Sequence, residues 1–77
     1  METFLAVADE LHFGRAAERL HMTTSGASQA IRSLERWIGG PLFERTSRRV
    51  RLTALGQQLL DGLKPAYAEI DRVLAQA

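Results

Sequence analysis

The stretch from Leu42 to Thr53, LFERTSRRVRLT, decides how the rest of the chain is interpreted. Polar and apolar residues alternate over RVRL, which is typical of a strand with one buried face. The preceding TSRR has the composition of a turn. We therefore expect a two-stranded hairpin with a basic tip, pinned to the core by apolar residues at its base. The anchors are Leu42, Phe43, Val50 and Leu52, and the outward arginines are Arg45, Arg48, Arg49 and Arg51.

Charge is distributed unevenly along the chain. The net charge is only +1 over 77 residues, yet residues 12–53 hold eight arginines against three acidic residues, a balance of +5. The remaining residues hold two basic against six acidic side chains, a balance of −4. A basic middle segment favours binding to a polyanion. The guanidinium group of arginine can form two parallel hydrogen bonds to a phosphate or to the edge of a guanine base. A GC-rich genome would also enrich arginine, but it would not segregate it.

Composition excludes several classes of protein. The chain has no cysteine, so disulfides and cysteine-rich metal sites are excluded. The hydrophobic content of 45% is that of a globular domain. No apolar run approaches the roughly 18 residues of a membrane span, and the acidic amino terminus METFLAVADE does not resemble a signal peptide. We expect one small cytoplasmic domain with no membrane partner and no cofactor.

Three helices are predicted before the hairpin. The first ends near Glu10 and presents one broad apolar face, formed by Phe4, Leu5, Val7, Ala8 and Leu11. The second covers residues 14–21, with Gly14 as its N-cap. Its inner face, Ala16, Ala17 and Leu20, is small enough to let another helix cross closely. Arg15, Glu18 and Arg19 are expected to face water or a phosphate.

The third helix begins at Thr23 or Thr24, either of which can accept a hydrogen bond from an unpaired N–H at the helix start. Gly39-Gly40 and Pro41 end it. Its buried stripe is Ala27, Ile31, Leu34 and Ile38, and its other face carries Thr24, Ser25, Ser28, Gln29 and Arg32. Two short helices joined by about three residues indicate a helix-turn-helix.

A long last helix follows, capped by Thr53. An apolar seam runs along it with heptad-like spacing, which we expect to dimerise because it exceeds what the small core can cover. The expected dimer residues are Leu59, Leu63, Ala66, Tyr67, Ile70, Val73 and Leu74. A self-packing helical hairpin is the alternative. Pro65 removes one helix hydrogen bond and crowds the carbonyl of Asp61, so a kink is expected and a full break stays open.

The sequence from FLAVADELHFGRAAERLH through AIRSLE to LFERTSRRVRLTALG resembles the N-terminal DNA-binding domain of LysR-type transcriptional regulators. The resemblance implies a mainly α fold: a winged helix-turn-helix, with a three-helix core and a two-stranded wing, followed by a long linker helix that pairs two subunits. We divide the chain into residues 1–53, the winged helix-turn-helix, and 54–77, the linker and dimerisation helix. The resemblance also implies transcription regulation in bacteria, with any small-molecule effector bound by a domain absent from this chain.

Sequence-specific binding of double-stranded DNA as a homodimer is the expected function. The second helix of such a motif lies in the major groove, which makes Thr24, Ser25, Ser28, Gln29 and Arg32 the candidate base readers. Two copies would enter successive grooves about 34 Å apart if the half-sites lie one turn apart. Candidates for the backbone or the minor groove are Arg15, Thr23, Arg45, Arg48, Arg49 and Arg51. The alternative is a protein-interaction or dimerisation module on the same scaffold without DNA binding.

Six further residues are interpreted one by one. Arg45 is expected either on DNA or as a brace paired with Glu35 or Glu44. Trp37 is expected to pack between the third helix and the long helix. Ser25 and Ser28 lack His and Asp partners, so no catalytic residue is assigned and the protein is not expected to be an enzyme. His12 and His21 are too isolated for a metal site and are assigned to loops or turns.

Overall fold

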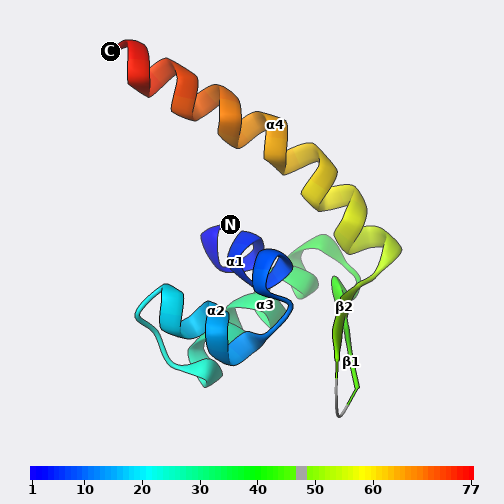
Figure 1. Ribbon diagram of the computed structural model, residues 1–77. Helices are drawn as coiled ribbons and strands as arrows, with labels where there is room; N and C mark the ends of the chain where they lie inside the picture. The colour runs from blue at the N-terminus through cyan, green and yellow to red at the C-terminus, as the bar shows by residue number, and fades with distance from the viewer. Residues whose placement is uncertain (47–48) are drawn as a thin grey trace.

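The computed structural model describes residues 1–46 and 49–77. Within that part of the chain the elements are α1 (Glu2–Glu10), α2 (Phe13–Arg19), α3 (Thr24–Ile38), β1 (Phe43–Arg45), β2 (Val50–Leu52) and α4 (Ala54–Gln76). The first three helices pack together, the β1–β2 hairpin extends to one side, and α4 projects away from them (Figure 1). The predicted fold, a winged helix-turn-helix followed by a long helix, is confirmed.

Two expectations about the first helices are wrong. Leu11 does not extend the apolar face of α1, because it ends the helix in the left-handed region with φ 50° and is 45% exposed. Gly14 is not the N-cap of α2. His12 caps that helix, its Nδ1 accepting a hydrogen bond of 3.0 Å from the backbone N–H of Arg15. A Cβ at Gly14 would lie 2.9 Å from Cε1 of His12, so the glycine leaves room for the capping ring.

The turn between α2 and α3 is closed by backbone hydrogen bonds. His21 adopts φ 56°, and its N–H donates to the carbonyl of Glu18, while the N–H of Met22 donates to the carbonyl of Ala17. This pair of bonds is a Schellman closure, which satisfies the last carbonyls of α2 and turns the chain sharply. Of the two predicted alternatives, Thr23 rather than Thr24 caps α3, its Oγ1 accepting from the N–H of Gly26 at 2.9 Å.

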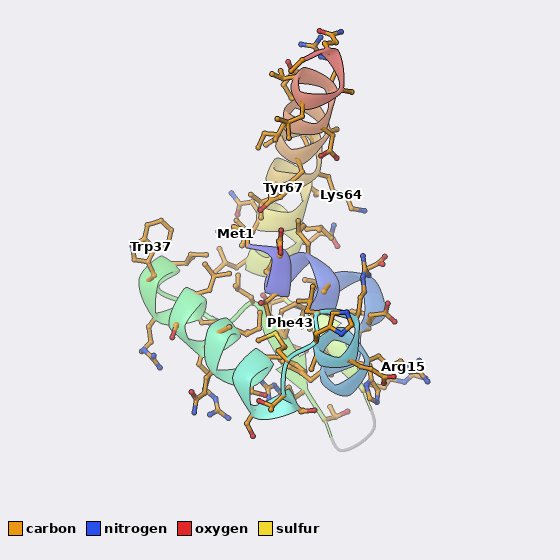
Figure 2. The ribbon with its side chains drawn as sticks, turned by 90° about the vertical axis from the view of Figure 1, so that its left-hand side faces the viewer. Met1, Arg15, Trp37, Phe43, Lys64 and Tyr67 are labelled. Carbon is orange, nitrogen blue, oxygen red and sulfur yellow. The ribbon has the colours of Figure 1, made fainter. Side chains whose placement is uncertain are left out.

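The core is centred on an aromatic cluster. Phe43 lies at the middle of the molecule (Figure 2), with ring centroids 5.5 Å from Phe4 and 5.9 Å from Phe13. The small inner residues of α2 are fully covered, Ala16 at 0% and Ala17 at 1% exposure. Close helix crossing is therefore made possible by alanine, as the sequence predicts.

The hairpin, which we call the wing (residues 43–52), is fastened at its base. Leu42 is fully buried, and its N–H donates to Oε2 of Glu35 at 2.7 Å. The strands are antiparallel in the register Phe43↔Leu52, Glu44↔Arg51 and Arg45↔Val50. Because side chains alternate along a strand, Arg45 shares the inner face with Phe43, whereas Arg51 shares the outer face with Glu44. All four predicted anchors lie in the core or pack against it.

Helix α4 begins against the base of the wing. The hydroxyl of Thr53 accepts from the N–H of Gly56 and donates to the carbonyl of Pro41 at 2.7 Å. Gly56 is buried at this junction, and Leu60, one turn further, is 8% exposed. The helix continues through Pro65 to Gln76 without a break. The first turns of α4 therefore belong to the core, and the later turns leave it.

The prediction for Trp37 is wrong. Its side chain is 81% exposed and projects from the carboxyl end of α3 (Figure 2). The adjacent Ile38 takes the inward position and packs against the core instead. Trp37 borders a shallow hollow of about 360 Å³ rather than filling it, and Met1, Leu55 and Leu59 line the same hollow.

Candidate nucleic-acid interface

The candidate base readers lie on the outer face of α3. Thr24, Ser25, Gln29 and Arg32 are exposed, and Ser28 is half-buried. The apolar stripe on the opposite side, with Ala27 at 0% and Ile31 at 1% exposure, fixes which side of the helix faces outward. The structure thus brings all five predicted residues to one helix surface, with short polar side chains at its amino-terminal end.

The wing lies beside that surface. Hydrogen bonds join Thr46 to Arg49: the N–H of Thr46 donates to the carbonyl of Arg49 at 2.8 Å, Oγ1 of Thr46 donates to the same carbonyl at 3.3 Å, and the N–H of Arg49 donates to Oγ1 of Thr46 at 3.0 Å. Arg49 and Arg51 are exposed. Arg48, predicted as a tip residue, lies outside the described residues.

Arg45 joins the wing to both helices of the helix-turn-helix. Its Nη1 donates to Oγ of Ser28 at 3.3 Å, and its Cζ lies 3.8 Å from the centroid of the Phe13 ring. The predicted brace to Glu35 or Glu44 is wrong. Glu35 is engaged by the backbone of Leu42, and strand alternation directs Glu44 to the other face of the wing.

The arginines of this surface are not neutralised by neighbouring carboxylates. Among the described residues, the three ion-pair contacts involve only Arg19, with Asp9 and Glu10, and Arg72, with Glu69. The positive charges of Arg15, Arg32, Arg45, Arg49 and Arg51 take part in none of these. A surface with uncompensated guanidinium groups attracts a polyanion.

Arg19 differs from the expectation that it faces water or a phosphate. Its Nη1 lies 2.7 Å from Oδ2 of Asp9 and 3.3 Å from Oε2 of Glu10, which ties α2 to the end of α1. The hydrogen bond that Arg19 donates to Asp9 raises the pKa of the Arg19 guanidinium above its usual value. Arg15, one turn earlier on α2, projects outward (Figure 2). The two arginines of α2 therefore have different surroundings.

The predicted dimer residues form a stripe along α4. Leu59 and Leu63 are half-buried and pack against the core, and Tyr67 is half-buried further along. Beyond them the stripe is open, with Ile70 and Val73 each 52% exposed. Ala66 and Leu74 are also exposed, Leu74 at 67%. The open part of the stripe lies on the half of α4 that projects from the body (Figure 1).

The sequence matches the family model described as bacterial regulatory helix-turn-helix protein, lysR family, over residues 1–57. This match spans more than half of the chain, from α1 through the wing to the first turn of α4. The chain belongs to the LysR family. The family resemblance drawn from the sequence motifs is therefore confirmed.

Curated relatives of this LysR-family chain are transcriptional regulators. The HTH-type transcriptional regulator IlvR of Caulobacter vibrioides is 56% identical over 68 residues, which are 88% of this chain and 23% of the relative. The uncharacterized HTH-type transcriptional regulator YnfL of Escherichia coli is 47% identical over 74 residues, 96% of this chain and 25% of the relative. The chain thus spans about a quarter of the length of these relatives.

Solved structures of LysR-family proteins have the same fold. A transcriptional regulator of the family from Eggerthella lenta aligns with a TM-score of 0.76 and 44% identity, over 80% of this chain and 89% of that one. The BenM DBD in its catB site 1 DNA complex aligns with a TM-score of 0.91 and 29% identity, over 97% of this chain and 83% of that one. The second alignment extends along almost the whole of this LysR-family chain, the long helix included.

Two residues of the site were missed by sequence reasoning. His12 is expected in a loop or turn and Phe13 is given no role, yet His12 caps α2 and Phe13 supports the guanidinium of Arg45. Histidine is not among the side chains preferred as N-caps, so no strong signal in the sequence points to the cap at His12. The contact of Phe13 with Arg45 joins residues 32 positions apart, and no local pattern predicts it.

Proposed function

We propose that this chain is the DNA-binding part of a bacterial transcription regulator and binds double-stranded DNA sequence-specifically. Helix α3 enters the major groove, with Thr24, Ser25, Ser28, Gln29 and Arg32 near base edges. The wing and the start of the helix-turn-helix follow the phosphates. Their proposed phosphate contacts are Arg15, Thr23, Arg48, Arg49 and Arg51, and Arg45 lies between the wing and α3, where it bonds to Ser28. A cytoplasmic location belongs to this proposal, because bacterial operators lie there, and no enzymatic role is part of it.

One observation carries the proposal: the outer face of α3 and the wing are joined through Arg45, and the arginines around them lack carboxylate partners among the described residues. A purely structural wing has no need of unpaired guanidinium groups. The BenM DBD, which has this fold, was solved in complexes with catB site 1 and benA site 1 DNA. The complexes support DNA binding by this fold, and the arginines without carboxylate partners are the basis for the proposed face.

Salt dependence of binding tests the proposal. Neutralising phosphates releases counterions, so affinity falls as salt rises. With three to five phosphate contacts per copy, a dimer is expected to lose about 10³–10⁵ in affinity between roughly 50 and 200 mM salt. Fluorescence anisotropy of a labelled duplex measures this slope. A flat response, or no binding at low salt, would favour the alternative of a protein-interaction module on the same scaffold.

Dimerisation through α4, residues 54–77, is the second part of the proposal. The open stripe around Ile70 and Val73 has no intramolecular cover, and its continuation at Leu59 and Leu63 borders the hollow beside Trp37. A second copy that lies along this stripe would cover all of these apolar side chains. The hydrophobic gain is about 25 cal/mol per Å² of apolar surface removed from water.

A pair of substitutions tests the dimer. Ile70→Glu puts a charge on the stripe, whereas Ala68→Glu puts the same charge on the opposite side of α4, where the side chain is also exposed. Sedimentation velocity is expected to show a dimer for the wild type and for Ala68→Glu, and a monomer at the same concentration for Ile70→Glu. If both variants dimerise equally well, the stripe is not the interface.

A further inference from the structure

Ser28 is the residue at which the wing touches the reading face of α3. Its Oγ accepts a hydrogen bond from Nη1 of Arg45 at 3.3 Å. Cζ of the same guanidinium lies 3.8 Å from the centroid of the Phe13 ring. Phe13 is 8% exposed and its ring packs edge-on against Phe43, so the platform under Arg45 is fixed by the core. Arg45 is therefore held by both Ser28 and Phe13.

In the hydrogen bond between Arg45 and Ser28, the arginine can only be the donor. A serine hydroxyl carries one donor and two acceptor positions, whereas a guanidinium carries donors only. Arg45 therefore occupies an acceptor position of Ser28 and leaves the O–H free to donate. The adjacent positive charge polarises the hydroxyl, which strengthens it as a donor and repels the hydrogen of any second donor. An isolated serine has no such preference and pairs with donors and acceptors alike.

We propose that Arg45 is a positioning residue that makes Ser28 an obligate hydrogen-bond donor on α3, and so determines which base edges Ser28 accepts. This inference rests on the proposed function, with α3 in the major groove. Ser28 then selects an acceptor: N7 or O6 of guanine, N7 of adenine, or O4 of thymine. The amino group of cytosine is disfavoured, because it is a donor facing a donor. Arg45 itself contributes no base contact in this arrangement.

The geometry distinguishes Arg45 from the other wing arginines. Arg51 is directed to the outer face of the wing, opposite Glu44, and Arg49 lies at the turn. In the described part of the chain, Arg45 is the wing arginine with a side-chain hydrogen bond to α3. Removing Arg49 or Arg45 takes one positive charge from the same surface, but only removal of Arg45 frees the acceptor positions of Ser28.

The test begins with selection of bound duplexes from a random pool with the wild type, which gives a preferred site. Affinities for all single-base variants of that site are then measured for the wild type and for Ser28→Ala, Arg45→Gln and Arg49→Gln. We expect Ser28→Ala and Arg45→Gln to relax selectivity at the same base-pair position, each by about threefold to tenfold. Arg49→Gln is expected to weaken all duplexes uniformly.

Two further measurements separate positioning from a structural role. In the double variant Ser28→Ala/Arg45→Gln, the loss of selectivity should equal that of Ser28→Ala alone, because Arg45 acts through Ser28. Where the selected base is a purine read at N7, its 7-deaza analogue should cost the wild type about threefold to tenfold and Ser28→Ala nothing. The Ser28→Ala comparison keeps the test valid if Arg45→Gln unfolds, since Ser28 lies at the helix surface.

Three results would contradict the proposed role of Arg45. A uniform loss for Arg45→Gln, as for Arg49→Gln, would make Arg45 a phosphate contact and overturn the inference while leaving DNA binding in place. Selectivity lost at different positions in the Ser28 and Arg45 variants, or a wild-type preference for cytosine at the Ser28 position, would overturn it equally. Absence of any salt-dependent duplex binding by the wild type would overturn the proposed function, and this inference with it.

Discussion

Replacing Gly56 by alanine should separate α4 from the base of the wing. A Cβ at this position would lie 2.1 Å from the carbonyl oxygen of Leu42 and 2.9 Å from Cδ2 of Leu52. Non-bonded heavy atoms in a packed interior are about 3.5–4 Å apart, so the helix and the wing would have to separate by about 1 Å or more. The same carbonyl accepts the N–H of Thr53 at 3.0 Å, and that hydrogen bond would be strained.

The change in the free energy of unfolding is the difference between a stabilising and a destabilising effect of the added methyl group. Alanine in a helix is favoured over glycine by about 0.5–1 kcal/mol. Overpacking a filled site costs about 1–3 kcal/mol, and a lost hydrogen bond adds about 1 kcal/mol. We therefore expect Gly56→Ala to destabilise the fold by about 2 kcal/mol, which for a domain of this size lowers Tm by about 8–16 °C.

Gly62→Ala is the matched control, since Gly62 lies in the same helix and its added Cβ would meet no atom within 4 Å. It should raise stability by about 0.5–1 kcal/mol. Thermal unfolding followed by far-UV circular dichroism measures both variants, at one protein concentration because a dimer makes Tm concentration-dependent. If Gly56→Ala is as stable as Gly62→Ala, the conclusion that α4 approaches the Leu42 carbonyl too closely for a side chain is wrong.

Three more predictions concern the DNA face, the dimer and the base of the wing. Arg48→Ala should weaken binding to all duplexes and flatten the salt slope by about one contact, whereas Gln29→Ala should mainly erode discrimination between sequences; equal effects on anisotropy-measured affinities would contradict the assignment. Trp37, the single tryptophan of the chain, should shift its fluorescence emission to shorter wavelength as protein concentration rises through dimerisation, and an unchanged spectrum in a proven dimer would mean that the partner leaves it exposed. Glu35→Ala should cost about 1–3 kcal/mol in urea unfolding, because the buried N–H of Leu42 loses its acceptor, while Glu35→Gln keeps an acceptor and should cost less.

Local patterns were sufficient at most positions where a single element decides the outcome. Threonine caps at Thr23 and Thr53 are set by a hydroxyl and an N–H three residues away, so the sequence predicts them directly. The stop at Gly39, with φ 97°, is likewise a property of one residue. The buried stripe of α3 follows from helical period alone. The N-cap prediction was wrong for α2, because histidine at position 12 is a less usual cap than the predicted Gly14.

Contacts between distant residues were not predictable in the same way. Glu44 is adjacent to Arg45 in the sequence and Glu35 lies ten positions before it, yet Arg45 stacks on Phe13 and bonds to Ser28. Which of these partners it meets depends on the position of the wing against α2 and α3, and that position is fixed by the burial of Leu42 and Phe43. Trp37 was expected to pack between α3 and α4, but its position in α3 turns it outward and gives the inner position to Ile38.

The sequence by itself determined the elements, their order, the basic character of the wing and the family, because these depend on the identity and spacing of neighbouring residues. Only the tertiary structure decided which arginines remain without carboxylate partners among the described residues, which hydroxyl Arg45 engages, and which apolar side chains α4 and Trp37 leave exposed. These outcomes depend on how three helices and a hairpin pack around one aromatic cluster. Packing is a property of all the side chains together, and no single stretch of sequence contains it.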